Sequence, residues 1–157
     1  MTFYVDTLAE AKRYGIEVKA DSTSNPILEE NENGLIKKDD NSIIIYVNPN
    51  DSLEMQRYTI AHALGHYINN HIDNENSVFR ETINNFFATY DLQEQEANRY
   101  ARKLLMPKEK IDFLLYSMHQ TKVKELAYSL IVPVEAMKQR LNDLGYVSIN
   151  YHQHLFL

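Results

Sequence analysis

The chain has 157 residues, of which 44% are hydrophobic and 24% charged, a balance typical of one globular domain with at most a small appendage. Its net charge of −6 argues against broad nucleic-acid binding, and the absence of Cys excludes disulfides and thiolate metal ligands. No stretch is apolar and long enough to span a bilayer and no signal peptide is recognisable, so we expect a cytoplasmic protein.

The first third of the chain predicts a short helix, a strand and a β-hairpin. Residues 5–14 carry apolar side chains at helical spacing and end before Gly15, where a C′ glycine is expected. Residues 16–20 alternate apolar with polar side chains and predict a strand. Two further apolar runs, 34–37 and 42–47, flank a polar four-residue connection and predict a hairpin, with the second run as an inner strand.

A long helix is predicted next, from about residue 52 to about residue 70. Asp51 followed by Glu54 fits a capping box at its start. Gly65 lies inside this helix, where glycine costs about 1 kcal/mol relative to Ala, so we expect a neighbouring strand to approach closely there. The side chains expected to face the core include those of Leu53, Ile60 and Leu64.

The remaining residues predict an irregular segment followed by helices. Residues 71–90 are rich in Asn and acidic side chains and are interpreted as a long loop over the site. Asp91 and Glu94 again fit a capping box, which begins a helix that ends before Pro107. Three more helices are expected at about 108–119, 121–128 and 133–145, and then a terminal strand or tail at 147–157.

Two histidines four residues apart carry the strongest chemical signal. His62 and His66 lie on one face of the predicted helix, one turn apart, and can bind one metal ion together. In the zinc peptidase pattern His-Glu-x-x-His, the glutamate after the first histidine is the general base, and here that position is Ala63. The pattern therefore predicts a zinc site that keeps its histidine ligands and lacks its base.

A catalytic zinc site needs a third protein ligand from another element. On the helix after Asp91, Glu94 and Asn98 share one face with Ala97, whose small side chain would allow close packing against the histidine helix. We assign Glu94 as the third ligand and Asn98 as hydrogen-bond partner of a ligand imidazole. Glu96 is the less favoured candidate, and His71 is expected to be a surface residue or a neighbour of a ligand.

Three sequence blocks in this order resemble the ImmA/IrrE family of metallopeptidases. They are RYTIAHALGHY at 57–67, EQEANRYA at 94–101 and LLMP at 104–107, and the resemblance extends roughly from residue 4 to residue 145. It implies an α+β fold, a small zincin-like (minimal gluzincin) domain with a short sheet packed on the histidine helix. It also implies Zn²⁺ as cofactor, and a ligand role for Glu94, because thermolysin-type relatives open a Glu-x-x-x-Asp/Asn pattern with their third ligand.

The resemblance also implies a function. Family members cleave or antagonise helix-turn-helix repressors and so switch on transcription, many of them encoded in phages, mobile elements and stress-response loci. We therefore predict a zinc-dependent endopeptidase that acts on a repressor encoded nearby. Loss of a positioned general base lowers a rate roughly 10²- to 10⁴-fold, so with Ala63 the chain is predicted to be an inactivated form, by an engineered substitution. The alternative is a natural pseudo-peptidase that sequesters a repressor or antitoxin partner without cleaving it.

A peptide substrate is expected to bind as an added strand against the hairpin, beside residues 35–37 or 42–47. Apolar contacts are expected from the segment that follows the histidine helix, through Val78, Phe79, Phe86 and Phe87.

The C-terminal helices invite a further hypothesis. We divide the chain into a metallopeptidase core, residues 1–107, and a helical extension, residues 108–157, packed on it. Residues 123–144 mimic a helix-turn-helix, but residues 121–145 contain four basic and three acidic side chains, a weak electrostatic footprint for DNA. We therefore favour packing or protein contact, and a DNA-binding regulator is the weaker third hypothesis.

Overall fold

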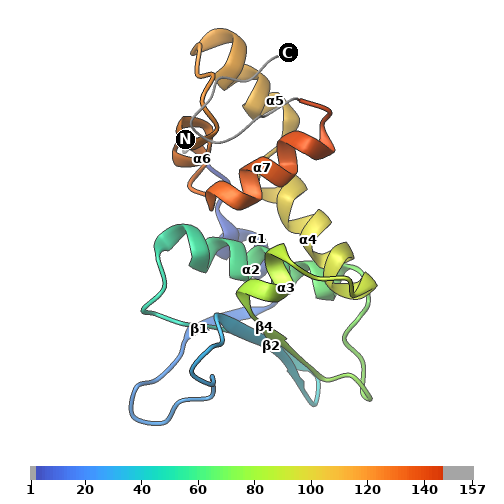
Figure 1. Cartoon of the computed structure of the whole chain (residues 1–157). Coiled ribbons are helices and arrows are strands. Elements are labelled where there is room, and N and C mark those ends of the chain that lie inside the picture. Colours follow the sequence, from blue (N-terminus) through green and yellow to red (C-terminus); the bar gives the residue numbers. More distant parts are fainter. Residues whose placement is uncertain (1–2, 147–157) are drawn as a thin grey trace. The chain divides into compact units, whose positions relative to one another are not determined.

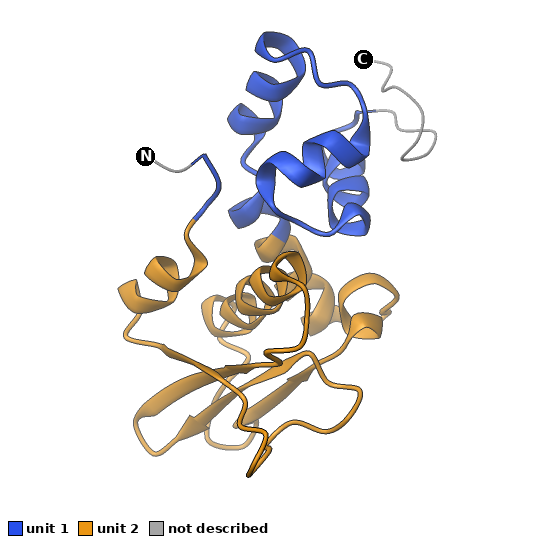
Figure 2. Cartoon of the chain, turned by 90° about the vertical axis from the view of Figure 1, so that its left-hand side faces the viewer, with its two compact units in different colours: residues 1–5, 102–157 blue, residues 6–101 orange. Residues whose placement is uncertain are grey.

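The computed structural model describes residues 3–146 and has an α+β architecture (Figure 1). The fold class predicted from the sequence, a small zincin-like domain with C-terminal helices, is confirmed. The chain forms two compact units (Figure 2): residues 6–101, and residues 1–5 with 102–157 as far as they are described. The boundary falls within one helix, α4, and the division predicted after Pro107 stays a prediction.

A four-stranded sheet forms one layer of the first unit. Its strand order is β1-β3-β2-β4, with β1 and β3 parallel and the other two pairs antiparallel. The strands are β1 (Glu17–Ala20), β2 (Gly34–Asp39), β3 (Ser42–Val47) and β4 (Val78–Glu81). The predicted hairpin is confirmed, but its connection is only Asp40 and Asn41, because Asp40 adopts a φ of 50° that a two-residue hairpin turn requires.

The strand β4 corrects the prediction of an irregular loop over residues 71–90. Val78–Glu81 pairs with β2, and a short helix, α3 (Ile83–Phe87), follows it. Thr82 caps α3, because its side chain accepts a hydrogen bond from the backbone N–H of Asn85. A four-residue strand between Asn-rich flanks carries too little periodicity to be recognised, since its formation depends on pairing with β2.

The helix α2 (Leu53–Ile68) carries both histidines and packs over the sheet, as Figure 1 shows. Its N-cap is Ser52, whose hydroxyl accepts a hydrogen bond from Met55 N–H at 3.2 Å, so the predicted capping box at Asp51 is wrong. Leu53 is also not a core residue, since 59% of its surface is exposed. The other two predicted core positions are buried, namely Ile60 and Leu64.

The helix α4 (Leu92–Leu105) lies against α2 at Gly65. A Cβ at this position would come within 2.6 Å of the carbonyl oxygen and 2.7 Å of the Cα of Ala97, which is closer than real contacts allow. The close approach at Gly65 is therefore confirmed, but the neighbour is a helix and not the predicted strand. The predicted start of α4 is confirmed as well, because Asp91 Oδ1 accepts a hydrogen bond from Glu94 N–H at 3.0 Å.

Helices form the described part of the second unit. They are α5 (Lys108–Asp112), the π-helical turn η1 (Phe113–Ser117), α6 (Val123–Leu130) and α7 (Val134–Asp143). The buried side chains of α6 and α7 are Val123, Leu126, Ala127, Leu130, Ala136, Met137, Arg140 and Leu141.

The terminal strand or tail predicted at 147–157 lies outside the described residues. In residues 3–146 no helix is both long and apolar enough to cross a bilayer. The remaining helix, α1 (Thr7–Arg13), belongs to the first unit.

Gly65→Ala tests the contact between α2 and α4. Alanine normally stabilises a helix by about 1 kcal/mol relative to glycine, but here its methyl group would collide with the Ala97 backbone. We expect a loss of about 1–3 kcal/mol in the free energy of unfolding, measured by urea denaturation, and weaker binding of the zinc ion predicted from the sequence, because α4 carries Glu94. The control is Gly15→Ala, where φ is 69° and no atom lies within 4 Å of an added Cβ: it should lose stability but keep its zinc affinity. Unchanged or increased stability of Gly65→Ala would contradict this packing.

Candidate metal centre

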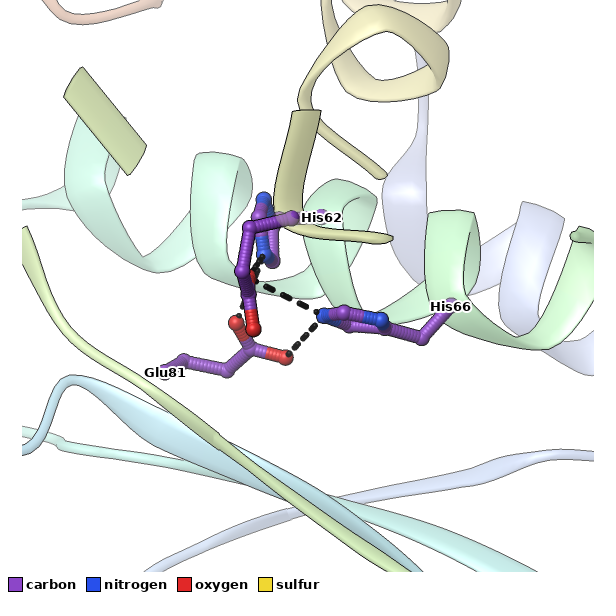
Figure 3. Close-up of side chains that lie close together, drawn as sticks. His62, His66 and Glu81 are labelled. Atoms are coloured by element: carbon purple, nitrogen blue, oxygen red, sulfur yellow. Dashed lines mark hydrogen bonds and ion pairs between the residues drawn. The ribbon is translucent and has the colours of Figure 1, made fainter. Parts of the chain in front are cut away.

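Four buried side chains converge between α2, α4 and β4, and Figure 3 labels three of them, His62, His66 and Glu81. The helix α2 provides His62 and His66, α4 provides Glu94, and β4 provides Glu81. One nitrogen or carboxylate oxygen from each residue lies within 4.8 Å of the corresponding atom of every other. His62, His66 and Glu81 have no exposed surface, and Glu94 is 9% exposed. The group therefore has the composition and spacing of a metal site.

The histidine nitrogens and carboxylate oxygens are so close to one another that a positive charge is needed between them. His62 Nε2 lies 2.8 Å from Glu94 Oε2 and 2.9 Å from Glu81 Oε2, and His66 Nε2 lies 3.3 Å from Glu94 Oε2. Within the described residues, His66 Nε2 and both oxygens of Glu81 have no hydrogen-bond partner. Buried polar atoms without partners are rare, and a divalent cation at their centre would satisfy them all. These residues therefore fit Zn²⁺, whose usual ligands are histidine and carboxylate.

The structure brings together the three residues that sequence analysis predicted as ligands, and adds Glu81. Of the two candidate glutamates, Glu94 lies at the centre, whereas Oε2 of Glu96 lies 3.1 Å from Nε2 of His71. Glu81 was missed because its segment was interpreted as a loop. The available signal was the alternation of Phe79 and Glu81 along a four-residue strand, which places both side chains on one face of the sheet.

Asn98 fixes the orientation of His62, as the sequence predicted it would do for a ligand imidazole. Its Oδ1 accepts hydrogen bonds from His62 Nδ1 at 2.8 Å and from the Tyr58 hydroxyl at 2.9 Å. Its Nδ2 donates to the backbone oxygen of Asn85 at 2.7 Å, which determines which end of the amide faces the histidine. His62 therefore carries its hydrogen on Nδ1, and in the neutral ring Nε2 presents a lone pair to the centre.

His66 is oriented by a second chain of hydrogen bonds. Its Nδ1 lies 3.0 Å from Nδ1 of His71, and Nε2 of His71 lies 3.1 Å from Glu96 Oε2. Because the carboxylate must accept, His71 donates from Nε2 and accepts at Nδ1 from His66. Nε2 of His66 is thus also left as a lone-pair donor for a metal. His71, only 6% exposed, is a neighbour of a ligand and not a surface residue.

Aromatic rings cover the histidines. Phe79 stacks on His66 with ring centroids 4.2 Å apart and an interplanar angle of 24°, and Phe86 lies 4.8 Å from His62. Ala63 has no exposed surface. Position 63 therefore lies inside the packed protein, and neither it nor the two histidines reaches solvent.

The sheet order also corrects the expected substrate path. Both predicted strands, β2 and β3, have neighbours on each side, so neither can accept an added peptide strand. The edges of the described sheet are β1 and β4. Of these, β4 carries Glu81 and Phe79, so a peptide strand beside the centre would have to pair there.

Opposite charges perturb the protonation of the metal-free centre. Burial opposes the charged form of His62, but the close charges of Glu81 and Glu94 and the hydrogen bond to Glu94 raise its pKa from 6.5 to about 9. Burial likewise opposes ionisation of Glu94, yet its hydrogen bond to His62 and its close contact with His66 lower its pKa from 4.5 to about 2. In the metal-free protein, a proton on His62 thus supplies part of the positive charge that the two carboxylates require.

These shifts predict the pH dependence of stability in the metal-free protein. The raised pKa of His62 contributes stability fully below about pH 6.5 that is lost as the pH rises through about 9. The lowered pKa of Glu94 contributes stability above about pH 4.5 that is lost as the pH falls towards about 2. Urea denaturation in chelator should therefore show weaker stability at pH 9.5 than at pH 6. In the zinc-loaded protein this alkaline loss should vanish, because the metal replaces the proton. An equal alkaline loss with and without zinc would contradict this account.

His71→Ala tests the positioning of His66. Removal of a group that orients a metal ligand lowers metal affinity about 10- to 100-fold, and we expect a zinc affinity lower by this factor in competition with a chelating dye. The matched control is His119→Asn, an exposed histidine of the second unit, which should bind zinc like the unchanged protein. Equal affinities for the two variants would show that His71 does not orient His66.

Comparison with known families agrees with this centre. The Peptidase_M78 model, described as the IrrE N-terminal-like domain, matches residues 11–142 and so includes all four converging side chains. No curated protein matches the chain at a significant level. The matched family is one of zinc-dependent metallopeptidases, and the match covers most of the chain. The chain belongs to the IrrE N-terminal-like family of metallopeptidases.

Proposed function

We propose that this chain is a zinc-binding protein of the ImmA/IrrE endopeptidase type in a catalytically inactivated form, which binds a helix-turn-helix repressor in the cytoplasm without cleaving it. One observation carries the proposal. His62 and His66 are both held in the tautomer that binds a metal, while the residue between them that should be the general base is Ala63.

The roles of the residues follow from their contacts. His62, His66 and Glu94 would hold the zinc ion, and Asn98 and His71 orient the two imidazoles. Zinc, when bound in such a site, supplies Lewis acidity towards a peptide carbonyl. The methyl group of Ala63 can neither accept a proton nor return one to a leaving amine, so the acid–base part of the reaction has no group at this position.

Several surface features support a protein partner. The edge strand β4 and the following helix expose apolar side chains, since Val78 is 44% and Ile83 is 54% exposed. An extended linker could add to this edge through backbone hydrogen bonds while its side chains meet those apolar groups. The net charge of −6 favours encounter with a basic partner, and DNA-binding repressors are basic on their recognition surface. The family resemblance supports a repressor encoded nearby.

The repressor of the neighbouring gene is the first partner to assay. We expect a complex that is stable in size-exclusion chromatography and contains intact repressor, with cleavage at least about 100-fold slower than that of a relative that keeps its base. Val78→Glu at the β4 edge should weaken binding at least tenfold by titration calorimetry. The control is Tyr128→Glu, a change at an 83% exposed aromatic residue of the second unit, which should leave binding unchanged. Rapid chelator-sensitive cleavage by the Ala63 protein would refute the inactivated form, and absence of any complex would refute repressor capture.

A further inference from the structure

We infer that Glu81 is a fourth protein ligand, which closes the metal centre and leaves no open position for a substrate or for water. The inference deepens the proposed function and rests on its zinc site. Catalytic zinc sites have three protein ligands and one open position, whereas structural sites have four protein ligands. The identity of the fourth neighbour therefore decides what kind of centre this chain contains.

The surroundings of Glu81 give the first argument. Its side chain has no exposed surface, and neither carboxylate oxygen has a hydrogen-bond partner among the described residues. An ionised carboxylate is not buried without partners unless a cation compensates it. The side chains nearest to its oxygens are the imidazoles of His62 and His66, whose Nε2 atoms lie at 2.9 and 3.8 Å. In Figure 3 the carboxylate of Glu81 points from below at the same space as both rings.

Distances give the second argument. Zinc bonds of about 2.0–2.2 Å in a four-coordinate site place neighbouring ligand atoms about 3.3–3.6 Å apart. The four contacts between histidine nitrogens and carboxylate oxygens are 2.8, 2.9, 3.3 and 3.8 Å, which bracket this spacing. Glu81 approaches His62 Nε2 as closely as Glu94 does. A general base, by contrast, must stand outside the ligand set so that water can lie between it and the metal.

Charge balance gives the third argument. Asn98 and His71 fix both imidazoles in neutral, lone-pair tautomers once a metal displaces the proton. Two carboxylates then neutralise Zn²⁺, whereas one would leave a net positive charge among buried aromatic rings such as Phe79 and Phe86. A neutral centre is the one that a buried apolar shell favours.

The strand register explains how Glu81 reaches α2. Glu81 pairs with Gly34 of β2, and a Cβ on Gly34 would lie 2.5 Å from Cγ2 of Thr59. The missing side chain at Gly34 therefore lets α2 pack tightly on the sheet one turn before His62. The alternating direction of strand side chains turns Arg80 to the other face, where it bonds to Glu32 at 2.7 Å. Glu81 is left on the helix side.

A closed centre changes the functional consequence of having alanine at position 63. With four protein ligands no substrate carbonyl can reach the metal, so a general base at position 63 would have nothing to activate. The metal would then join α2, α4 and β4 and stabilise the surface that binds the partner. The loss of the base and the presence of a fourth ligand thus describe one non-hydrolytic centre.

The test uses the whole protein, first without any substitution. The cobalt-substituted protein should show the intense visible bands of four-coordinate cobalt, acetohydroxamate should not alter these bands, and the bound cobalt should not enhance the relaxation of solvent protons, because no water is coordinated. A solvent ligand in the unchanged protein, or a spectrum altered by the hydroxamate, would overturn the inference.

Two variants then assign the fourth ligand. Glu81→Ala should lower zinc affinity more than about 100-fold, weaken the cobalt bands and make them sensitive to the hydroxamate. Glu81→Gln keeps the shape of the side chain and should also bind zinc more weakly if the alanine variant fails to fold. The matched control is Glu32→Gln, another buried carboxylate linked to β4 through Arg80, which should keep the cobalt spectrum. Unchanged affinity and spectrum in both Glu81 variants would refute the fourth ligand.

The two possible failures are distinguishable. If the unchanged protein binds no zinc, the proposed function fails together with this inference. If His66→Ala abolishes zinc binding but substitutions of Glu81 leave the zinc affinity unchanged, the zinc site stands and only the closed centre fails.

Discussion

The contact between the backbones of Gly65 and Ala97 is the constraint on which the metal centre depends. A helix pair separated by ordinary side chains would hold Glu94 too far from the histidines to share an ion with them. Here the missing Cβ of Gly65 lets the Ala97 carbonyl approach where a methyl group would stand, and Glu94 lies one turn earlier on the same helix. The distance of 2.8 Å between His62 Nε2 and Glu94 Oε2 follows from this packing.

A second glycine, Gly34, allows α2 to pack closely on the sheet. Gly34 lets Thr59 of α2 approach β2, and its register partner Glu81 thereby comes within ion-pair distance of His62. Both close approaches are made by glycines, one inside α2, where glycine is otherwise unfavourable, and one at the first residue of β2. They place two carboxylates from different elements around one histidine pair, and this arrangement creates an excess of negative charge that a divalent cation would neutralise.

Sequence alone could predict the local part of this account. The spacing of His62 and His66 requires only a helix, and the preference for Glu94 over Glu96 requires only knowledge of which side chains share a helix face. Gly65 signalled a close contact but could not say with what, because the partner depends on how α4 crosses α2. Glu81 could not be found this way, because its role depends on pairing between β4 and β2 and on which face of the sheet α2 covers. The burial of Ala63 could not be predicted for the same reason, because it is a property of the packed helices and not of the motif.

The centre thus combines the ligands of a peptidase with the closure of a structural site. Asn98 and His71 fix the tautomers of the two histidines, and the carboxylates of Glu81 and Glu94 are buried. The position of the general base is occupied by the methyl group of Ala63. The most direct test of this account is a crystal structure of the protein purified without chelator, with anomalous diffraction recorded at the zinc edge. The account predicts one zinc ion per chain bound by Nε2 of His62, Nε2 of His66 and the carboxylates of Glu81 and Glu94. A zinc ion bound by three of these residues and a solvent molecule, with Glu81 turned away, would contradict it.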